Sequence, residues 1–396
     1  MSLFVLEGWG LSFLLPFHRR AHQQELHSGR SFPLDGLRGV LAVTVFFTHV
    51  TSYYAYEKTS IWDYPPSNFY SQAAIFPVTM FFFITAYLFW SKLIANPLAF
   101  RWNFLLGRFG RLMPAYFFAC CLLFLLAAYA SHFHRQVSLG KLGTQIVVWS
   151  AFWGNSDING VNDSKLWFVV SWTLRYEWLF YFSLPFVGWF ARRKKRAFLL
   201  LGIAAALGPM IERFSPATRL GAPLRLLGLY SHFLAFTFSI GILVALLPKG
   251  SLSAWAKGKQ ATVFSLICLG YVLFFVPPKY GLLESLFLAF PFACICMGNS
   301  WFGLLSSRPF LFLGRISYSF YLLHQIFLSA VLFILKRSGF ILVGLNPIHY
   351  WLIAMGCGMF TILICAFSYQ LLEAPFLHVG KAPRALEGQP QTHAAH

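Results

Sequence analysis

The chain has 396 residues, of which 58% are hydrophobic, 19% are aromatic and only 11% are charged. Soluble globular proteins carry about 25% charged residues, so this composition excludes a water-soluble enzyme and a disordered protein. It indicates an all-α, polytopic membrane protein. Lys and Arg outnumber Asp and Glu by 31 to 12, a formal charge of +19. In a membrane protein such an excess reflects basic loops that face the cytoplasm, and no nucleic-acid partner is expected.

The N-terminal segment, residues 1–31, lacks the pattern of a signal peptide. Glu7 stands near its start, Gly8 and Gly10 interrupt its apolar stretch, and no small-residue cleavage site follows. We expect this segment to be a cytoplasmic or interfacial arm. Residues 32–377 are expected to form one transmembrane domain, followed by a cytoplasmic tail over residues 378–396.

Apolar stretches recur at the length that a membrane-crossing helix needs, about 20 residues. They predict about ten transmembrane helices, at 37–56, 74–94, 112–130, 167–190, 197–211, 226–247, 260–276, 281–298, 316–335 and 349–372. The stretch 142–153 is too short to cross and is expected to be re-entrant or interfacial. With the N-terminus inside, most Lys and Arg residues fall on the inner side, including the run at 192–196. This bias predicts a multi-pass protein of the inner (plasma) membrane with both termini in the cytoplasm.

The first predicted helix carries two polar residues that share one face. Arg38 and His49 are eleven residues apart, close to three helical turns. The helical rise separates them by about 16 Å, which puts Arg38 near the inner surface and His49 near mid-membrane. This spacing suits a long anionic ligand held at one end and reacted at the other. Alternatively, Arg38 is a surface anchor, His49 is a packing residue and Asp35 caps the helix.

Two later helices carry further candidates. Arg108 and Arg111 lie three residues apart on one face, which suits phosphate binding, although ordinary inner-surface arginines would look the same. Glu177 lies within an aromatic helix, where a neighbouring imidazole would give the carboxyl group a partner. A structural Glu–Arg or Glu–His pair that holds helices together is the alternative for Glu177.

The segment 312–327 offers hydroxyl groups rather than a single site. Arg315 and His324 are nine residues apart, on opposite helix faces, so they are not expected to act together. Ser317, Tyr318 and Tyr321 could cross-link helices or line a cavity, and structural roles are favoured for this segment. The seven cysteines all lie in apolar runs without zinc-site spacing, so no metal site is expected.

Six short motifs in this order resemble the acyltransferase 3 family of integral membrane acyltransferases, from about Phe32 to Leu377. They are LDGLRGVLAV with the following histidine, FFFITAYL, RFGRLMPAY, SWTLRYEWLFY, LGRISYSFYLLH and LLEAPF. The chain departs from the family pattern in the second motif, where Thr85, Ala86 and Tyr87 stand in place of the usual Ser-Gly-Phe/Tyr.

The resemblance implies transfer of an acyl group, usually acetyl, from cytoplasmic acyl-CoA to a hydroxyl of a cell-envelope glycan or a lipid-linked sugar. It implies that His49 is the catalytic base, with Glu177 as its partner, because a hydroxyl needs a proton acceptor when it attacks. Arg38, Arg108 and Arg111 would bind acyl-CoA. Supporting roles are implied for the other residues of the motifs, namely Asp35, Trp172, Tyr181, Arg315, Ser317 and Tyr318.

No tightly bound cofactor is expected, because acetyl-CoA or another acyl-CoA would be the donor substrate. Membrane lipids are expected to surround the protein. The polar run 154–165, within the outer segment 132–166, is where we expect contacts with the acceptor. Two other classes remain open. A proton-coupled transporter or flippase could use the same buried His and Glu as a proton relay, and a non-catalytic binding protein could retain the scaffold.

Overall fold

A computed structural model describes Phe4, Glu7, Gly10 and residues 32–95, 102–154, 156–190, 232–248, 250–340 and 346–378. Within these ranges every regular element is helical and none is a strand, which confirms the all-α prediction for the part described. The predicted span 197–211, the basic run 192–196, most of the 1–31 arm and the tail after His378 lie outside the described residues.

The elements comprise twelve helices and four short helical turns in the described ranges. The helices are α3 (Phe32–Thr59), α4 (Asn68–Ala95), α5 (Trp102–Ala130), α6 (Leu139–Ser150), α7 (Trp172–Phe190), α10 (His232–Leu246), α11 (Ser251–Ala256), α12 (Lys259–Phe275), α13 (Leu282–Cys296), α14 (Arg308–Arg315), α15 (Ser317–Arg337) and α16 (Pro347–Ser368). The turns are η2 (Ser164–Ser171), η3 (Leu304–Ser306), η4 (Tyr369–Glu373) and η5 (Ala374–His378).

Four of the described helical segments are long and apolar enough to cross a membrane: Asn68–Ala95, Phe104–Ala130, Ser317–Arg337 and Pro347–Phe376. Three further apolar helices are shorter, at Phe236–Leu246, Lys259–Phe275 and Leu282–Cys296. These segments are those of a membrane protein, whereas the count of ten spans remains a prediction. α3 is 28 residues long, but polar side chains such as Thr44, Thr48 and His49 lower its hydropathy.

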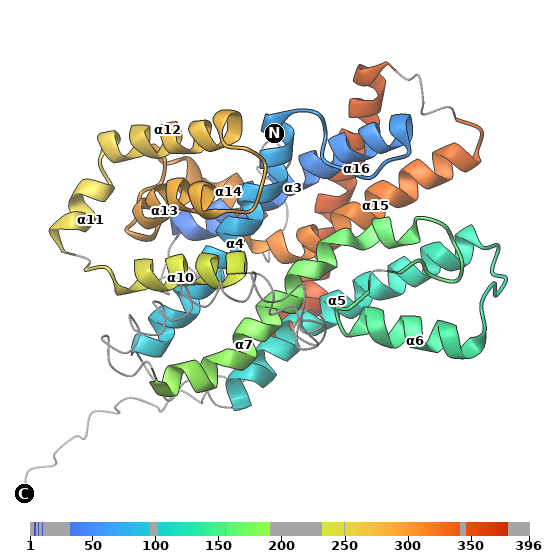
Figure 1. Ribbon diagram of the computed structural model, residues 1–396, viewed down its shortest axis with the longest axis horizontal. Coiled ribbons are helices and arrows are strands. Elements are labelled where there is room, and N and C mark those ends of the chain that lie inside the picture. The colour runs from blue at the N-terminus through green and yellow to red at the C-terminus, as the bar shows by residue number, and fades with distance from the viewer. Residues whose placement is uncertain are drawn as a thin grey trace, which may run out of the picture.

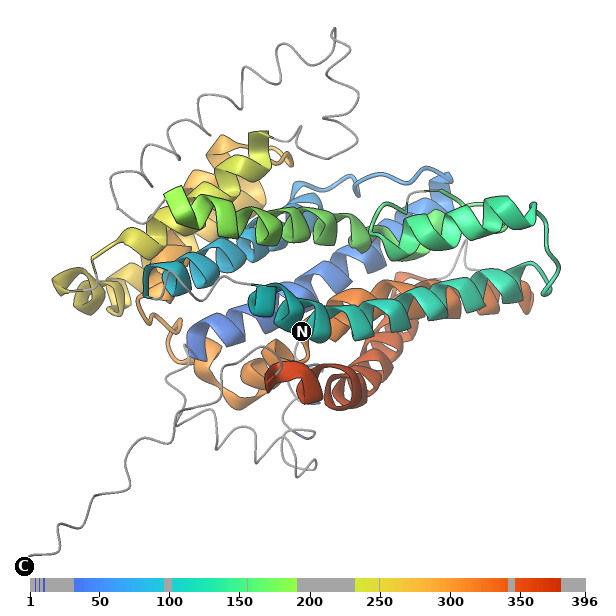
Figure 2. The same cartoon turned by 90° about the horizontal axis from the view of Figure 1, so that it is seen from below.

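α3 lies between two hydrophobic clusters. One cluster joins it to α5, η2, α7, α15 and α16, and the other joins it to α4, α10, α12 and α13. The axes of α3, α4, α5 and α7 are roughly aligned, with α10 to α13 gathered at one end (Figures 1 and 2). Because α3 is covered on both sides, its polar face points into the protein.

Glycines let α3 cross η3 and α14 with the backbones in contact. A Cβ atom on Gly36 would lie 1.8 Å from the Leu305 carbonyl oxygen, and one on Gly314 would lie 1.8 Å from that of Asp35. Only a residue without a Cβ atom permits this approach. The crossing brings the start of α3, with Arg38, beside the end of α14, with Arg315.

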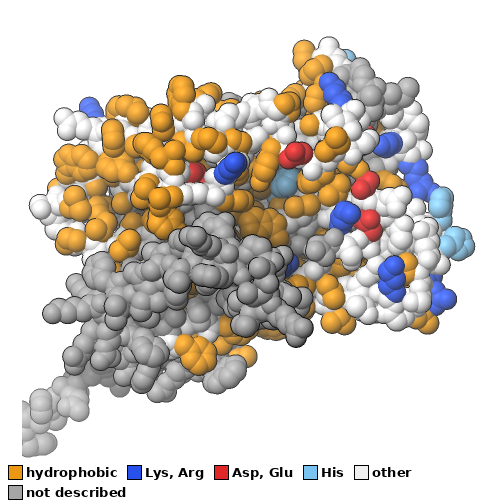
Figure 3. Space-filling view, in the orientation of Figure 1, with side chains coloured by type: hydrophobic (Ala, Val, Ile, Leu, Met, Phe, Trp, Pro, Cys, Tyr) orange, Lys and Arg blue, Asp and Glu red, His pale blue; other side chains and the backbone are white. Residues whose placement is uncertain are grey.

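The face of the molecule shown in Figure 3 is divided by polarity. Hydrophobic side chains spread over the region of α11 to α13, whereas charged side chains gather toward the end where α5, α6 and α15 meet. α6, at 12 residues, is too short to cross a membrane and packs against α5. Its position is compatible with the interfacial piece expected at 142–153.

Candidate active site

The predicted span 167–190 is not one continuous α-helix. It begins as the 3₁₀ turn η2, in which Phe168 has non-helical angles (φ −144°, ψ 45°), and continues as α7. Such a break leaves backbone groups without helical partners, which inside a membrane protein must be satisfied by side chains. Gln325 and Tyr53 donate to the Leu166 carbonyl oxygen at 2.6 and 3.0 Å, and the Val170 N–H donates to Gln325 Oε1 at 3.3 Å.

A cavity of about 320 Å³ lies beside this break. It is bounded by the polar face of α3, the loop after α3, the η2–α7 junction and α15. Its lining comprises Val45, Thr48, His49, Ser52, Trp62, Asp63, Tyr64, Ala74, Val78, Val169, Val170, Trp172, Tyr280 and Tyr321. Burial, together with the Asp63 carboxylate, raises the pKa of the Tyr64 hydroxyl above its ordinary value.

His49 lies in this cavity between two other rings. Its centroid is 5.3 Å from that of His324 and 6.3 Å from that of Trp62, which stacks on it at an interplanar angle of 17°. The His49 Nδ1 atom is buried and has no hydrogen-bond partner. His324 was expected to be structural, since helix periodicity compares residues only within one helix. Its position opposite His49 depends on the packing of α15 against α3.

Glu177 does not form a hydrogen bond with His49. Its Oε1 atom accepts bonds from Thr85 Oγ1, at 3.3 Å, and from the Tyr181 hydroxyl. Arg108 is among its electrostatic neighbours. The expected direct pairing of Glu177 with His49 is therefore not formed, because the carboxylate is held by α4 and by the next turn of its own helix.

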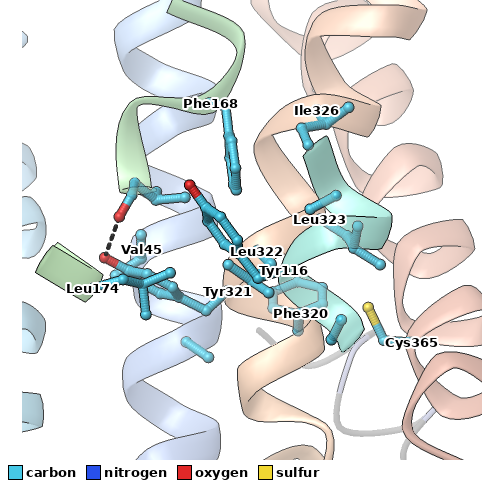
Figure 4. Packing of buried hydrophobic residues seen from close by; sticks show 14 of the residues in the cluster. Val45, Tyr116, Phe168, Leu174, Phe320, Tyr321, Leu322, Leu323, Ile326 and Cys365 are labelled. Atoms are coloured by element: carbon cyan, nitrogen blue, oxygen red, sulfur yellow. Dashed lines mark hydrogen bonds between the residues drawn. The ribbon is translucent and has the colours of Figure 1, made fainter. Parts of the chain in front are cut away.

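Tyr321 connects the two regions. Its ring centroid lies 6.2 Å from that of His324, and its hydroxyl is 2.9 Å from Thr173 Oγ1. The hydroxyl also donates to the Val170 carbonyl oxygen at 3.5 Å, across the gap between α15 and the end of η2 (Figure 4). Glu177 is one of its electrostatic neighbours. Tyr321 therefore lies between the His49 and His324 imidazoles and the Glu177 carboxylate.

Basic residues gather at the opposite end of α3 from the cavity. Arg38, Arg111 and Arg315 line a small second pocket together with Asp35, Leu311, Gly314 and Tyr369. Arg108 lies beside this group, with its guanidinium carbon 4.7 Å from the Phe89 ring centroid and 5.8 Å from that of Phe104. These cation–π contacts help to hold Arg108 in place, and Glu177 is an electrostatic neighbour of its guanidinium group. The structure therefore brings all three predicted acyl-CoA arginines to one end of the helix bundle.

Glu373 is a buried acid that the sequence analysis did not single out, although it belongs to the LLEAPF motif. It is fully buried on η4 and accepts a hydrogen bond of 2.5 Å from Ser319 Oγ. Arg38 and Arg111 are its electrostatic neighbours. The carboxylate therefore offsets part of the positive charge of the basic cluster.

The remaining supporting residues have mixed positions. Trp172 lines the cavity, whereas Ser317 donates to the Gly314 carbonyl oxygen at 2.8 Å and supports the α14–α15 junction. The Tyr318 hydroxyl donates to the Leu112 carbonyl oxygen at 2.9 Å, linking α15 to α5. Among the described residues, no group of three His, Cys, Asp or Glu side chains is placed to hold a metal ion.

The outer run 154–165 uses its polar side chains internally. The Asn159 amide donates to Ser131 Oγ and to the His134 carbonyl oxygen, both at 2.9 Å, and its Oδ1 accepts from the Gln136 N–H at 3.0 Å. None of the described residues in 154–165 lines the cavity, whereas Trp62, Asp63 and Tyr64 do. The loop after α3, rather than the predicted run, borders the site.

The fold and the site define a helical membrane protein with a buried histidine cavity and a basic cluster about three turns apart along one helix. A family model described as an acyltransferase domain matches residues 33–369. Because the match covers most of the chain, the protein belongs to the acyltransferase 3 family, and it is an acyltransferase. A search of curated proteins and a search of solved structures each found no match.

Proposed function

We propose that this membrane acyltransferase moves an acyl group, with acetyl as the expected one, from cytoplasmic acyl-CoA to a hydroxyl of a cell-envelope glycan or a lipid-linked sugar. The observation that carries the proposal is the position of His49 in a cavity about three turns along α3 from the arginine cluster. A donor with a charged nucleotide and a long flexible arm fits such a separation, because one end can be held while the other reaches the imidazole.

The arginines are the proposed binding site for the donor phosphates. Guanidinium groups pair with phosphate through two parallel hydrogen bonds and keep their charge when buried. Arg38, Arg111 and Arg315 surround one pocket, and Arg108 is fixed beside them by its aromatic contacts. Glu177 and Tyr181 then belong to the donor side, where they help to position Arg108 rather than His49.

In the proposed reaction, the acceptor hydroxyl oxygen attacks the thioester carbonyl carbon while His49 accepts the hydroxyl proton. The carbon–sulfur bond breaks, CoA leaves as a thiolate, and that sulfur takes the proton back from His49. A hydroxyl is a weak nucleophile at neutral pH, so a positioned base contributes roughly 10²–10⁴-fold to such a step. The ester product and CoA leave by opposite ends of the site.

The acceptor is proposed to enter beside the loop that follows α3. Trp62 and Tyr64 of this loop, with Tyr280 and Trp172, give the cavity an aromatic border, and Asp63 adds a hydrogen-bond acceptor. Aromatic faces and carboxylates together suit a polyhydroxylated ligand. We place the protein in the inner membrane with both termini in the cytoplasm, so that the arginine cluster faces the compartment that supplies acyl-CoA.

The test incubates the purified protein with acetyl-CoA and an envelope-glycan extract. Turnover is measured as the release of free CoA and as a gain of one acetyl mass in the glycan. We expect His49→Ala to lower the rate by about 100-fold or more, the loss of a general base, while its melting temperature stays near that of the parent. Proton-coupled uptake into vesicles with no CoA release would instead favour a transporter.

A further inference from the structure

Two ring nitrogens on the neighbouring helices α3 and α15 are buried without a hydrogen-bond partner. They are Nδ1 of His49 and Nε2 of His324. The ring centroids are 5.3 Å apart, with an interplanar angle of 39°. Buried polar atoms are nearly always hydrogen-bonded in native proteins, so two orphans on neighbouring rings call for a common explanation.

The tautomer of His324 is fixed by its surroundings. Its Nδ1 atom lies 2.8 Å from the Phe320 carbonyl oxygen. A carbonyl oxygen can only accept, so Nδ1 must carry the hydrogen and Nε2 of the neutral ring must be an acceptor. The rings of Phe46, Phe320 and Tyr321 surround the imidazole, with centroids at 5.8 to 6.2 Å, and hold its plane in place.

His49 offers the complementary group. If its hydrogen is on Nδ1, that atom can donate to Nε2 of His324, through a small ring rotation or one bridging water. The lone pair on Nε2 of His49 is then free for the acceptor hydroxyl. We infer that His324 is the positioning residue that fixes the tautomer and the orientation of His49, the role that the sequence had suggested for Glu177.

This inference rests on the proposed acyl transfer. When Nε2 of His49 takes the hydroxyl proton, the positive charge is shared across the Nδ1–H···Nε2 bond with His324. The Phe320 carbonyl oxygen stabilises the far side of the pair. The proton on Nε2 of His49 then passes to the CoA sulfur, so the pair returns to its starting state. No group other than the acceptor, the donor and the two rings takes part.

Two amide variants separate positioning from packing. In His324→Asn the short side chain can keep the bond to the Phe320 carbonyl oxygen but cannot reach the position of Nε2. In His324→Gln the longer side chain can place its amide oxygen there as an acceptor. We expect His324→Asn to lower kcat for acetyl transfer about 100-fold with an unchanged KM for acetyl-CoA, and His324→Gln to retain activity within about tenfold of the parent.

The matched control is His349→Asn, because His349 is exposed at the start of α16 and should tolerate the change. Equal kcat values for His324→Asn and the parent, or equal losses in the Asn and Gln variants with unchanged melting temperatures, would overturn the inference. Either result leaves the proposed function standing if His49→Ala is inactive. If the parent protein does not turn over acetyl-CoA, the proposed function itself is contradicted.

Discussion

Arg111 shows how a single charged side chain can serve two purposes in this protein. It lines the small pocket with Arg38 and Arg315, and it is an electrostatic neighbour of the buried Glu373. Its Nε atom is buried and has no hydrogen-bond partner. A guanidinium group that is only partly satisfied by the protein has donors left for an anionic ligand.

We predict that Arg111→Gln raises the KM for acetyl-CoA about tenfold, equivalent to about 1.4 kcal/mol of binding, and leaves kcat nearly unchanged. The loss should disappear with S-acetylpantetheine, which lacks the phosphates. Steady-state kinetics with both donors measures the difference. Arg135→Gln, a change at an exposed position outside the cluster, is the control. A similar KM change for the phosphate-free donor would contradict the phosphate-binding role.

At the residue scale, the sequence predicts what lies on one helix better than what lies between helices. Arg38 and His49 could be assigned to one face because helical periodicity relates them directly. The His49–His324 contact could not be found that way, because its two members are brought together by the packing of α3 on α15. The same limit applies to the hydrogen bond between Glu177 and Thr85, since Thr85 comes from α4.

Among the helices, α3 crosses η3 and α14 with the backbones in contact beside the basic cluster. The Gly36 Cα lies so near the Leu305 carbonyl that no Cβ atom fits between them. This crossing sets the position of Arg38 relative to Arg315. A change in the backbone separation would therefore disturb both stability and the basic cluster.

We predict that Gly36→Ala destabilises the protein by about 1–3 kcal/mol, because the added methyl group forces the two backbones apart. Thermal unfolding of the detergent-purified protein should show a lower melting temperature. Gly270→Ala on α12 is the matched control, since a Cβ atom there meets nothing within 4 Å and alanine favours a helix. If Gly36→Ala has the same melting temperature as the parent protein, the crossing accommodates a Cβ atom at this position, which contradicts the prediction.

The break between η2 and α7 could not be predicted from the apolar pattern of the sequence. The stretch 167–190 has the length and apolar character of one span, yet it divides into η2 and α7. The break is stabilised by Gln325 and Tyr53, which lie on other helices. Since these partners are remote in sequence, local propensity could not indicate that the break would be tolerated.

For the whole molecule, composition alone predicted the class correctly. The low charged fraction and the long apolar stretches indicated an all-α membrane protein, and the described residues are helical with four segments long enough to span. The number of spans was harder to predict, because α10, α12 and α13 are 15 to 17 residues long. Helices of that length can cross a thinner or locally deformed bilayer as well as lie within the protein.

We propose that the two sites along α3 open to opposite sides of the membrane. The arginine cluster would take the donor from the cytoplasm, and the histidine cavity would meet the acceptor from the other side. This separation is a property of the whole molecule and does not depend on which sugar is the acceptor.

The most direct test supplies radiolabelled acetyl-CoA, which does not cross membranes, to sealed vesicles of known orientation that carry the protein and its native envelope glycans. We predict that inverted vesicles, whose cytoplasmic face is outside, incorporate label into glycans enclosed in the lumen. Right-side-out vesicles and vesicles carrying His49→Ala should not. Equal incorporation by right-side-out vesicles given the same external donor would contradict the account.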